Sequence, residues 1–479
     1  MSTSTLDQNA ADAADAADAA DAAAVPGPDP VLVPDPEPGP VHDILGIGFG
    51  PANLALAIAL EEGGSPLTAR FLEARPSPEW QPGMLLDGSD IQNHPSRDLV
   101  TLRNPRSRYS FLNYLHEQGR LLRHLNLPSE FPLRKEYAGY IRWAAGFFRH
   151  LVDCGQRAQG VEVVERDGER LYEVTTRSGR RYLGRSLVLG PGRTPYVPAP
   201  YDTAGSARVF HLTEYLPRLA QLAGPGAEPA AVAVIGGSQS AVELALDLTR
   251  RYPRAKVTVY TRSHSLRQKD TSPFSEEGYF PEFTDYYFNA SRAGKTALDA
   301  YMHPTNYSSA DSDVLRELYL TIYEQELDGD QRVSVRGNHE AVAVRADDDR
   351  VTLDLVERNT GIRVSDTVDL VVLATGFRNM GPGGHEEPCP PLMAPLAHAF
   401  ATEPDGRLRV GYDYALDPLD ATTPPLFLNG LCESSHGIGD AGSFSLLSLR
   451  AAALTAALTE RLAGPAPTRA DRGAELAAA

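Results

Sequence analysis

The stretch VHDILGIGFGPANLALAIAL, residues 41–60, decides the fold. Its apolar beginning predicts a buried strand, its glycines predict a tight turn, and the part from Pro51 to Leu60 predicts a helix. The sequence ARFLE, residues 69–73, predicts a second strand. A strand, a helix and a strand in this order form a βαβ unit, whose crossover connection requires a parallel sheet.

The glycine turn of this unit predicts a dinucleotide site. Gly46, Gly48 and Gly50 let the backbone approach a pyrophosphate, and Pro51 begins a helix whose N-terminal N–H groups attract phosphate. Glu73 ends the next strand, where an acidic side chain accepts hydrogen bonds from ribose hydroxyls.

A second unit of the same kind lies further along the chain. The sequence AVAVI, residues 231–235, runs into GGSQSA, residues 236–241, and a helix to Arg251 and a strand over 257–260 follow. This strand ends at Arg262 instead of an acid. Because an acid repels a 2′-phosphate and an arginine attracts one, the sequence favours NADPH over NADH. The alternative is that Arg262 is only a solvated charge at a strand end.

Two dinucleotide units in one chain indicate a flavoprotein that a nicotinamide reduces. We therefore expect an α/β protein with two Rossmann-like dinucleotide-binding domains, the second inserted into the first, and a small, mostly helical substrate region. The expected FAD domain covers residues 41–205 and resumes over 335–463, with C-terminal substrate contacts and a strand at 370–373. The expected NADPH domain covers 206–334 and includes a substrate-binding segment at 265–330. The Ala/Asp- and Pro-rich residues 1–40, together with 464–479, are expected to be disordered tails.

Composition excludes several other classes of protein. The 479 residues include 45 Lys and Arg against 63 Asp and Glu, and the formal net charge of −18 argues against a nucleic-acid partner. No apolar run reaches the length of a membrane span, the N-terminus does not resemble a secretory signal, and no metal site is expected. The three cysteines are scattered, which suits a cytoplasmic enzyme. A dithiol disulfide reductase is disfavoured, because no cysteine precedes Cys154.

Further motifs follow in order along residues 41–455. They are GFGPANL at 48–54, WQPGM at 80–84, RDLVT at 97–101, YSFLNYL at 109–115, GGSQSA at 236–241, SPF at 272–274, TNYS at 305–308, ATGF at 374–377, HG at 436–437 and LLS at 446–448. In this order they resemble the flavin-dependent N-hydroxylating monooxygenases, the ornithine and lysine N-monooxygenase family of siderophore pathways.

The resemblance implies a cycle with FAD, NADPH and molecular oxygen. NADPH reduces FAD, a flavin hydroperoxide forms, and a neutral amine attacks its distal oxygen. The family's FAD contacts would fall on Glu73, Trp80, Gln81, Gln92 and Leu446, and also on Asp440, for which an Asx turn is the alternative. Its NADPH contacts would fall on Gly236, Gly237, Ser238, Gln239, Ser240, Arg262 and Ser308. Asn306 would be the catalytic residue, in contact with both substrate and nicotinamide ribose, and Ser448 would lie near the substrate.

Two departures from the family concern the substrate. Arg97 stands where ornithine enzymes usually have the lysine that holds the substrate carboxylate, and Glu276 stands where they usually have asparagine. Arg97 keeps the charge and gains a bidentate fork, although it could instead pair with Asp98 or another acid. Glu276 could hold a second ammonium, carry a proton away, or be an exposed loop acid. Lysine or ornithine is the first expectation, while a shorter diamino acid, a diamine and aspartate stay open. A flavin reductase that serves a partner, a redox-sensing module and a homo-oligomer are also left open.

Overall fold

The computed structural model describes residues 39–203, 205–222, 228–440 and 442–463. Apart from Gly39 and Pro40, the two predicted tails lie outside these ranges. Within the described residues, no helix combines the length and the apolar character needed to cross a membrane.

The first sheet contains the first βαβ unit and has the strand order β3-β2-β1-β6-β5-β4, with β15 also paired to β6. Its strands are β1 (Val41–Ile47), β2 (Ala69–Glu73), β3 (Val152–Cys154), β4 (Ala158–Arg166), β5 (Glu169–Thr176), β6 (Arg181–Leu189) and β15 (Leu426–Leu428). The pairs among β3, β2, β1, β6 and β15 are parallel, whereas β4, β5 and β6 pair antiparallel. The parallel arrangement confirms the crossover predicted from residues 41–73.

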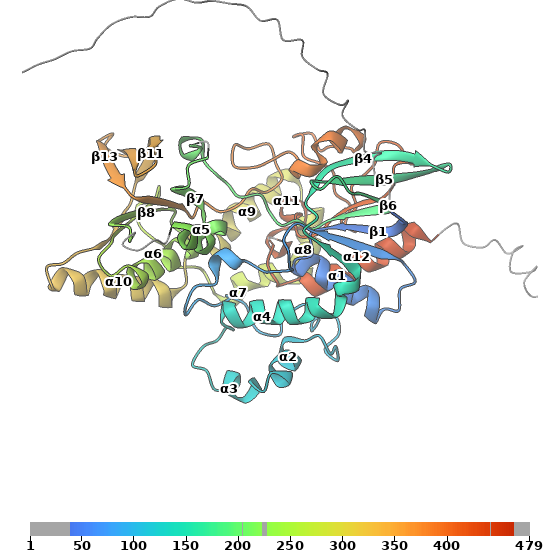
Figure 1. Ribbon diagram of the computed structural model, residues 1–479, viewed down its shortest axis with the longest axis horizontal. Coiled ribbons are helices and arrows are strands. Elements are labelled where there is room, and N and C mark those ends of the chain that lie inside the picture. The colour runs from blue at the N-terminus through green and yellow to red at the C-terminus, as the bar shows by residue number, and fades with distance from the viewer. Residues whose placement is uncertain (1–38, 204, 223–227, 441, 464–479) are drawn as a thin grey trace, which may run out of the picture. The chain divides into compact units, whose positions relative to one another are not determined.

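Helices pack along one side of this sheet, and the segment with the 3-10 turn Pro391–Ala399 packs against β4 (Figure 1). The helices of this part are α1 (Pro51–Glu62), α2 (Phe111–Glu117), α3 (Leu121–Leu125), α4 (Arg134–Ala145), α11 (Glu433–His436) and α12 (Leu447–Leu462). Apolar residues of α1 and α4 form one core with the loop around Leu99 and Phe111. The segment 380–416 and α12 contribute to a second core with β1, β6 and β15. The C-terminal helix α12 packs directly against α1, so the chain's last helix lies beside its first.

The second sheet is wholly parallel, with the order β10-β9-β8-β14-β7. Its strands are β7 (Val209–His211), β8 (Ala231–Ile235), β9 (Lys256–Tyr260), β10 (Val333–Arg336) and β14 (Leu370–Leu373). The helices of this part are α5 (Tyr215–Leu222), α6 (Gln239–Arg251), α7 (Pro273–Glu276), α8 (Pro281–Asn289), α9 (Arg292–Asn306) and α10 (Ser312–Leu327). The segment predicted at 265–330 is therefore largely helical.

A three-stranded antiparallel sheet covers one face of the second sheet, as the orange strands beside β7 and β8 show in Figure 1. It consists of β11 (His339–Ala346), β12 (Val351–Glu357) and β13 (Arg363–Val368). Short 3-10 turns complete the described elements at Pro82–Met84, Gly146–Leu151, Ala199–Tyr201, Leu212–Glu214, Glu277–Tyr279, Pro391–Ala399 and Ile438–Asp440.

The strand pairing corrects one expected domain boundary. The return to the first domain was expected at residue 335, but β11–β13 pack on the second sheet and β14 pairs with β8 and β7 inside it. The next strand of the first sheet is β15 at 426–428. The second domain is thus inserted between β6 and β15, and it extends beyond β14.

The two connections between the domains run side by side. The amide of Tyr196 donates to the carbonyl of Gly376 at 2.9 Å, and the amide of Arg378 donates to the carbonyl of Thr194 at 2.8 Å. Pro195 and Phe377 form an antiparallel bridge between them. The inserted domain therefore begins and ends at one short, paired stem.

Candidate active site

The first glycine turn has the geometry that a pyrophosphate requires. Gly48 has a φ of +82°, and a Cβ atom there would lie 2.5 Å from the carbonyl oxygen of Gly190. Gly50 precedes α1, and no described atom lies within 4 Å of where its Cβ would be. The N-terminus of α1 is thus open to an anion. Glu73 accepts a 2.9 Å hydrogen bond from the amide of Phe49, so it supports the turn from the end of β2.

Three of the other predicted FAD contacts lie in the connection between β2 and α4. Gln81 and Gln92 both adopt the left-handed region, with φ values of 45° and 52°. Such conformations are uncommon outside glycine and gather at ligand sites. Trp80 packs edge-on against Tyr137 and Phe444, at centroid distances of 5.8 and 5.3 Å.

Asp440 and Leu446, the remaining predicted FAD contacts, are both buried near the start of α12. The carboxylate of Asp440 accepts a 2.7 Å hydrogen bond from the amide of Cys432 and forms a buried ion pair with Arg450. Arg450 also donates to Asn429, whose side chain donates to Asn53 beside the first glycine turn. Asp440 therefore connects the C-terminal segment to that turn through other side chains.

The second glycine turn is packed as closely as the first. Gly236 has a φ of +153°, and its Cβ would lie 2.4 Å from the carbonyl oxygen of Ala374. A Cβ at Gly237 would lie 2.4 Å from Oγ1 of Thr261. Ser238 is the N-cap of α6, and within the described residues its side chain forms no capping hydrogen bond. This helix N-terminus can also receive a phosphate.

Arg262 lies exposed just after β9, as the strand-end prediction required. Its carbonyl accepts a 3.1 Å hydrogen bond from Nη1 of Arg358, which brings a second guanidinium to the same strand end. Ser240 is half-buried in the first turn of α6.

A cavity of about 350 Å³ lies between the segment that follows β9 and the end of α9. Its lining includes Ser263, Arg267, His303, Tyr307 and Ser308. Asn306 is the last residue of α9, directly before two of these lining residues. Of the predicted site residues, Ser308 therefore lines this cavity, whereas Asn306 precedes the lining residues along the chain and is not one of them.

The two residues that depart from the family lie next to each other. Nη1 of Arg97 is 3.7 Å from Oε2 of Glu276, and the Arg97 guanidinium lies 6.0 Å from the ring centre of Tyr279. Arg97 thus pairs with another acid, as the alternative allowed, although that acid is Glu276 and not Asp98. Asp98 is buried and accepts hydrogen bonds from the amides of Thr101 and Phe111, so it holds the loop together.

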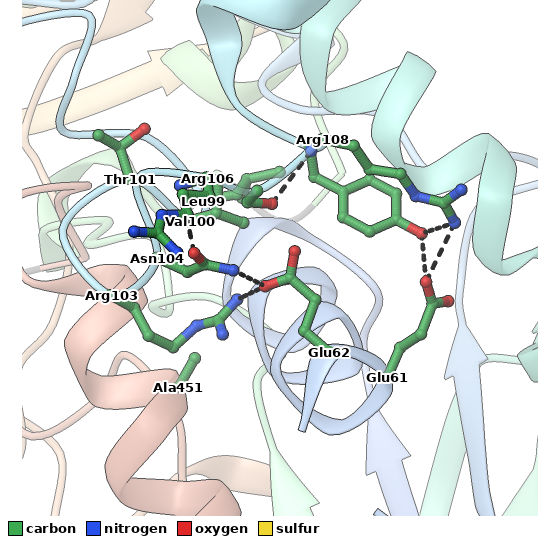
Figure 2. A network of polar contacts seen from close by, with 12 residues as sticks. Glu61, Glu62, Leu99, Val100, Thr101, Arg103, Asn104, Arg106, Arg108 and Ala451 are labelled. Atoms are coloured by element: carbon green, nitrogen blue, oxygen red, sulfur yellow. Dashed lines mark hydrogen bonds and ion pairs between the residues drawn. The ribbon is translucent and has the colours of Figure 1, made fainter. Parts of the chain in front are cut away.

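A polar network fixes the loop that follows Arg97 onto the end of α1 (Figure 2). Glu62 accepts hydrogen bonds from Arg103 at 2.6 Å and Asn104 at 3.2 Å. Glu61 accepts from Arg108 at 3.1 Å and from the hydroxyl of Tyr109 at 2.6 Å. Because α1 begins at the first glycine turn, this network relates the position of the loop to that turn.

Ser448 has an unsatisfied side chain. It is 1% exposed, and its Oγ has no hydrogen-bond partner among the described atoms. A buried hydroxyl without a partner is costly, so a bound group that accepts or donates a hydrogen bond fits here. Ala441, in the loop that precedes Leu446 and Ser448, lies outside the described ranges.

A buried polar cluster directly beyond Asn306 had no signal in the sequence. Glu433 accepts hydrogen bonds from the hydroxyl of Tyr307 at 2.5 Å, from Asn379 at 2.9 Å and from Arg193 at 3.2 Å. Burial raises the pKa of Glu433, while Arg193 opposes that shift. The four residues come from separate segments, and only Tyr307 belongs to a recognised motif.

Comparison with known proteins identifies the class. The family model for L-lysine 6-monooxygenase/L-ornithine 5-monooxygenase matches residues 40–379. The chain belongs to this family. It is 37% identical to the L-ornithine N(5)-monooxygenase of Burkholderia cepacia, over 83% of this chain and 90% of that protein.

Solved structures agree with this assignment. An ornithine N-hydroxylase from Kutzneria sp. 744, described with reduced FAD, NADP⁺ and L-ornithine, has a TM-score of 0.81 and 31% identity, over 88% of this chain and 100% of that one. The L-lysine 6-monooxygenase of Pseudomonas syringae has a TM-score of 0.76 and 31% identity, over the same shares. The predicted fold class and the predicted class of enzyme, an NADPH-dependent flavin N-monooxygenase, are confirmed. FAD and NADPH are likewise confirmed as the cofactors of the family to which the chain belongs.

Proposed function

We propose that this enzyme uses FAD and NADPH to hydroxylate the side-chain amine of a zwitterionic diamino acid, L-ornithine or L-lysine. The observation that carries the substrate proposal is the pairing of Arg97 with Glu276. A diamino acid presents a carboxylate and an α-ammonium at one end and its reactive amine at the other. One basic and one acidic side chain, 3.7 Å apart, match that end in both charges.

The same pair disfavours two of the other substrates that the sequence left open, a diamine and aspartate. A diamine carries no carboxylate for Arg97. Aspartate could place its α-carboxylate and α-ammonium on the pair, but its other end would then be a carboxylate, with no amine to hydroxylate. Asp98, the acid next to Arg97 in the chain, is engaged elsewhere, because it accepts hydrogen bonds from the amides of Thr101 and Phe111.

The two glycine turns and four further residues have roles in this proposal. The first glycine turn and Glu73 would hold FAD, which, when bound and reduced, supplies the activated oxygen. The second glycine turn and Arg262 would hold NADPH. Asn306 would hold substrate and nicotinamide ribose in register from the end of α9, and Ser448 would donate to the bound group that its orphaned hydroxyl requires. The amine reacts without its proton, whose pKa is ~10.4 for a lysine side chain, so hydroxylation should rise with pH.

The test is a panel of amines scored for hydroxylamine formed per NADPH consumed. L-Ornithine, L-lysine, 2,4-diaminobutyrate, cadaverine and L-aspartate separate the substrate classes. We expect that, of this panel, only ornithine or lysine gives hydroxylamine in step with NADPH consumption. Better coupling with cadaverine or aspartate would contradict the zwitterion proposal. NADPH oxidation without any hydroxylamine would favour the flavin reductase instead.

The cellular setting is part of the same proposal. We place the enzyme in the cytoplasm, in siderophore or other secondary-metabolite biosynthesis. The three cysteines, all free in the structure, support a reducing compartment. Whether the enzyme forms a homo-oligomer stays a prediction, which light scattering of the purified protein tests.

A further inference from the structure

Six polar residues form a closed hydrogen-bonded ring between the two domains. Three of them precede or begin α4 in the first domain, and three belong to α6 or to the start of α10 in the second. In order around the ring they are Asp90, Arg134, Glu243, Gln239, Asp311 and Gln92.

One side of the ring is a buried ion pair. Arg134 binds both carboxylate oxygens of Glu243 at 3.0 Å, and the two side chains are only 9% and 4% exposed. The guanidinium also donates to the carbonyls of Met84 and Asp90, at 3.0 and 2.9 Å. This is the bidentate, fully bonded geometry in which a buried pair is most rigid.

The other side of the ring passes through Asp311. Its amide donates to Oε1 of Gln239 at 2.8 Å, and its carboxylate accepts from Nε2 of Gln92. The amide of Gln92 donates to Asp90 at 2.9 Å, which supports the left-handed backbone of Gln92. Asp311 thus touches one residue expected to contact FAD and one expected to contact NADPH.

We propose that Asp311 is a positioning residue that holds the two cofactor sites in register for hydride transfer. Through Gln239 it fixes the N-terminus of α6, and through Gln92 it fixes the loop of the flavin domain. Lys269 also acts on the carboxylate of Asp311 by attraction, and Asp313 and Glu243 act on it by repulsion. The inference rests on FAD and NADPH as the cofactors of the proposed function.

The experiment compares four variants of the FAD-loaded enzyme without amine and without oxygen. Asp311→Ala removes the acceptor, Asp311→Asn keeps an oxygen that can accept from Gln92, and Asp311→Glu displaces the carboxylate by one methylene. Asp313→Ala is the matched control, because Asp313 is an exposed acid two residues away in the same helix turn.

We expect Asp311→Ala to reduce its flavin with NADPH about 10–100 times more slowly at saturation, because small displacements of reacting groups have effects of this size. Reduction by dithionite should be unchanged. The second readout is the change in the flavin absorbance spectrum when NADP⁺ is added. Its shape should change in Asp311→Ala, while the Kd for NADP⁺ stays within about threefold. Asp311→Asn should recover most of the rate, and Asp313→Ala should behave like the wild type.

Several outcomes would overturn the inference. They are a wild-type rate and spectrum in Asp311→Ala, an equal loss in Asp311→Asn, or an equal loss in Asp313→Ala. If Asp311→Ala does not retain FAD, Asp311→Glu is used for the test instead. Flavin reduction by NADPH at the wild-type rate in Asp311→Glu would then count against the proposal. A wild-type enzyme that NADPH does not reduce at all would instead contradict the proposed function.

Discussion

Nη1 of Arg97 lies 3.7 Å from Oε2 of Glu276, and the two side chains remain 23% and 30% exposed. Partly solvated pairs of this kind contribute little to stability. A ligand can therefore separate the pair at low cost. The substrate carboxylate would replace Glu276 at Arg97, and the α-ammonium would replace Arg97 at Glu276.

Replacement of Arg97 should uncouple the enzyme. Losing one charge-assisted contact of ~1.5–3 kcal/mol implies a KM for the diamino acid about 10–100-fold higher in Arg97→Ala. NADPH oxidation should continue and release hydrogen peroxide in place of hydroxylamine. Arg97→Lys should restore part of the coupling, because the charge returns without the fork. A coupled Arg97→Ala with an unchanged KM would remove the carboxylate role.

Replacement of Glu276 tests the other half of the pair. Glu276→Gln keeps the shape and removes the charge, so we expect the KM for the diamino acid to rise about tenfold. Glu277→Gln, at the adjacent acid, is the control. Steady-state kinetics of hydroxylamine formation measure both. If Glu276→Gln binds the diamino acid more tightly, Glu276 only competes for Arg97 and does not hold the ammonium.

Arg262 should select NADPH over NADH. Arg262→Ala should raise the KM for NADPH roughly 10–100-fold and leave that for NADH nearly unchanged, because only NADPH carries the 2′-phosphate. Arg254→Ala is the matched control, since Arg254 is an exposed arginine that precedes the N-terminal end of β9, whereas Arg262 follows its C-terminal end. Equal losses with both nucleotides would contradict the 2′-phosphate role.

Alanine substitutions at Gly48 and Gly50 in the first turn should lower FAD retention for different reasons. Gly48→Ala forces an alanine into a positive φ and a 2.5 Å contact, so it should lower both FAD retention and the melting temperature of the apoprotein. Gly50→Ala meets no described atom within 4 Å, so it should lower FAD retention alone. Flavin content and thermal unfolding of the apoproteins distinguish the two. Full FAD retention by Gly50→Ala would contradict a cofactor at the N-terminus of α1.

Asp90 should make the enzyme less stable as the pH rises. Burial raises the pKa of Asp90 to about 6, against ~3.9 in an unfolded chain; the hydrogen bond from the amide of Gln92 opposes this shift, and Glu243, Asp311 and Asp313 add to it. Between these values the folded protein binds a proton that the unfolded chain does not, so stability falls as the pH rises through this window.

Asp90→Asn removes this cost and keeps an oxygen for the amide of Gln92. It should stabilise the enzyme by about 1–2 kcal/mol at pH 8 and by nothing below about pH 4. Thermal unfolding across this range measures the difference, with Glu326→Gln, at an exposed acid near the other end of α10, as the control. An equal gain at every pH would show that the effect is not titration of Asp90.

The strongly patterned parts of the fold could be predicted from the sequence. The strands at 69–73 and 231–235 have the predicted bounds, because short stretches of strand-forming residues between Gly- and Pro-containing segments are local signals. The domain boundary at 335 was wrong, because the run at 370–373 is typical of any buried strand. Which sheet it joins depends on partners far away in the chain, and no local signal carries that information.

In the candidate site, too, residues with a local sequence signal could be predicted and residues that depend on distant partners could not. Glycine turns and Arg97 could be found because each lies in a motif with its own spacing. Asp311 belongs to none of the motifs found in the sequence, and its contacts with Gln92 and Gln239 span 219 and 72 positions of sequence. The contact with Gln239 forms when the second domain folds, and the contact with Gln92 forms only when the two domains pack against each other.

The paired stem at Thr194–Tyr196 and Gly376–Arg378 has a consequence for how this enzyme could be altered. The nucleotide domain begins and ends where two backbone segments already hydrogen-bond. If it were removed, the two chain ends left on the flavin domain would therefore lie close together, and a short turn could join them without displacing β6 or β15. The flavin half could then be produced as a continuous chain of its own, and a nucleotide domain from a relative could be grafted at the same two positions.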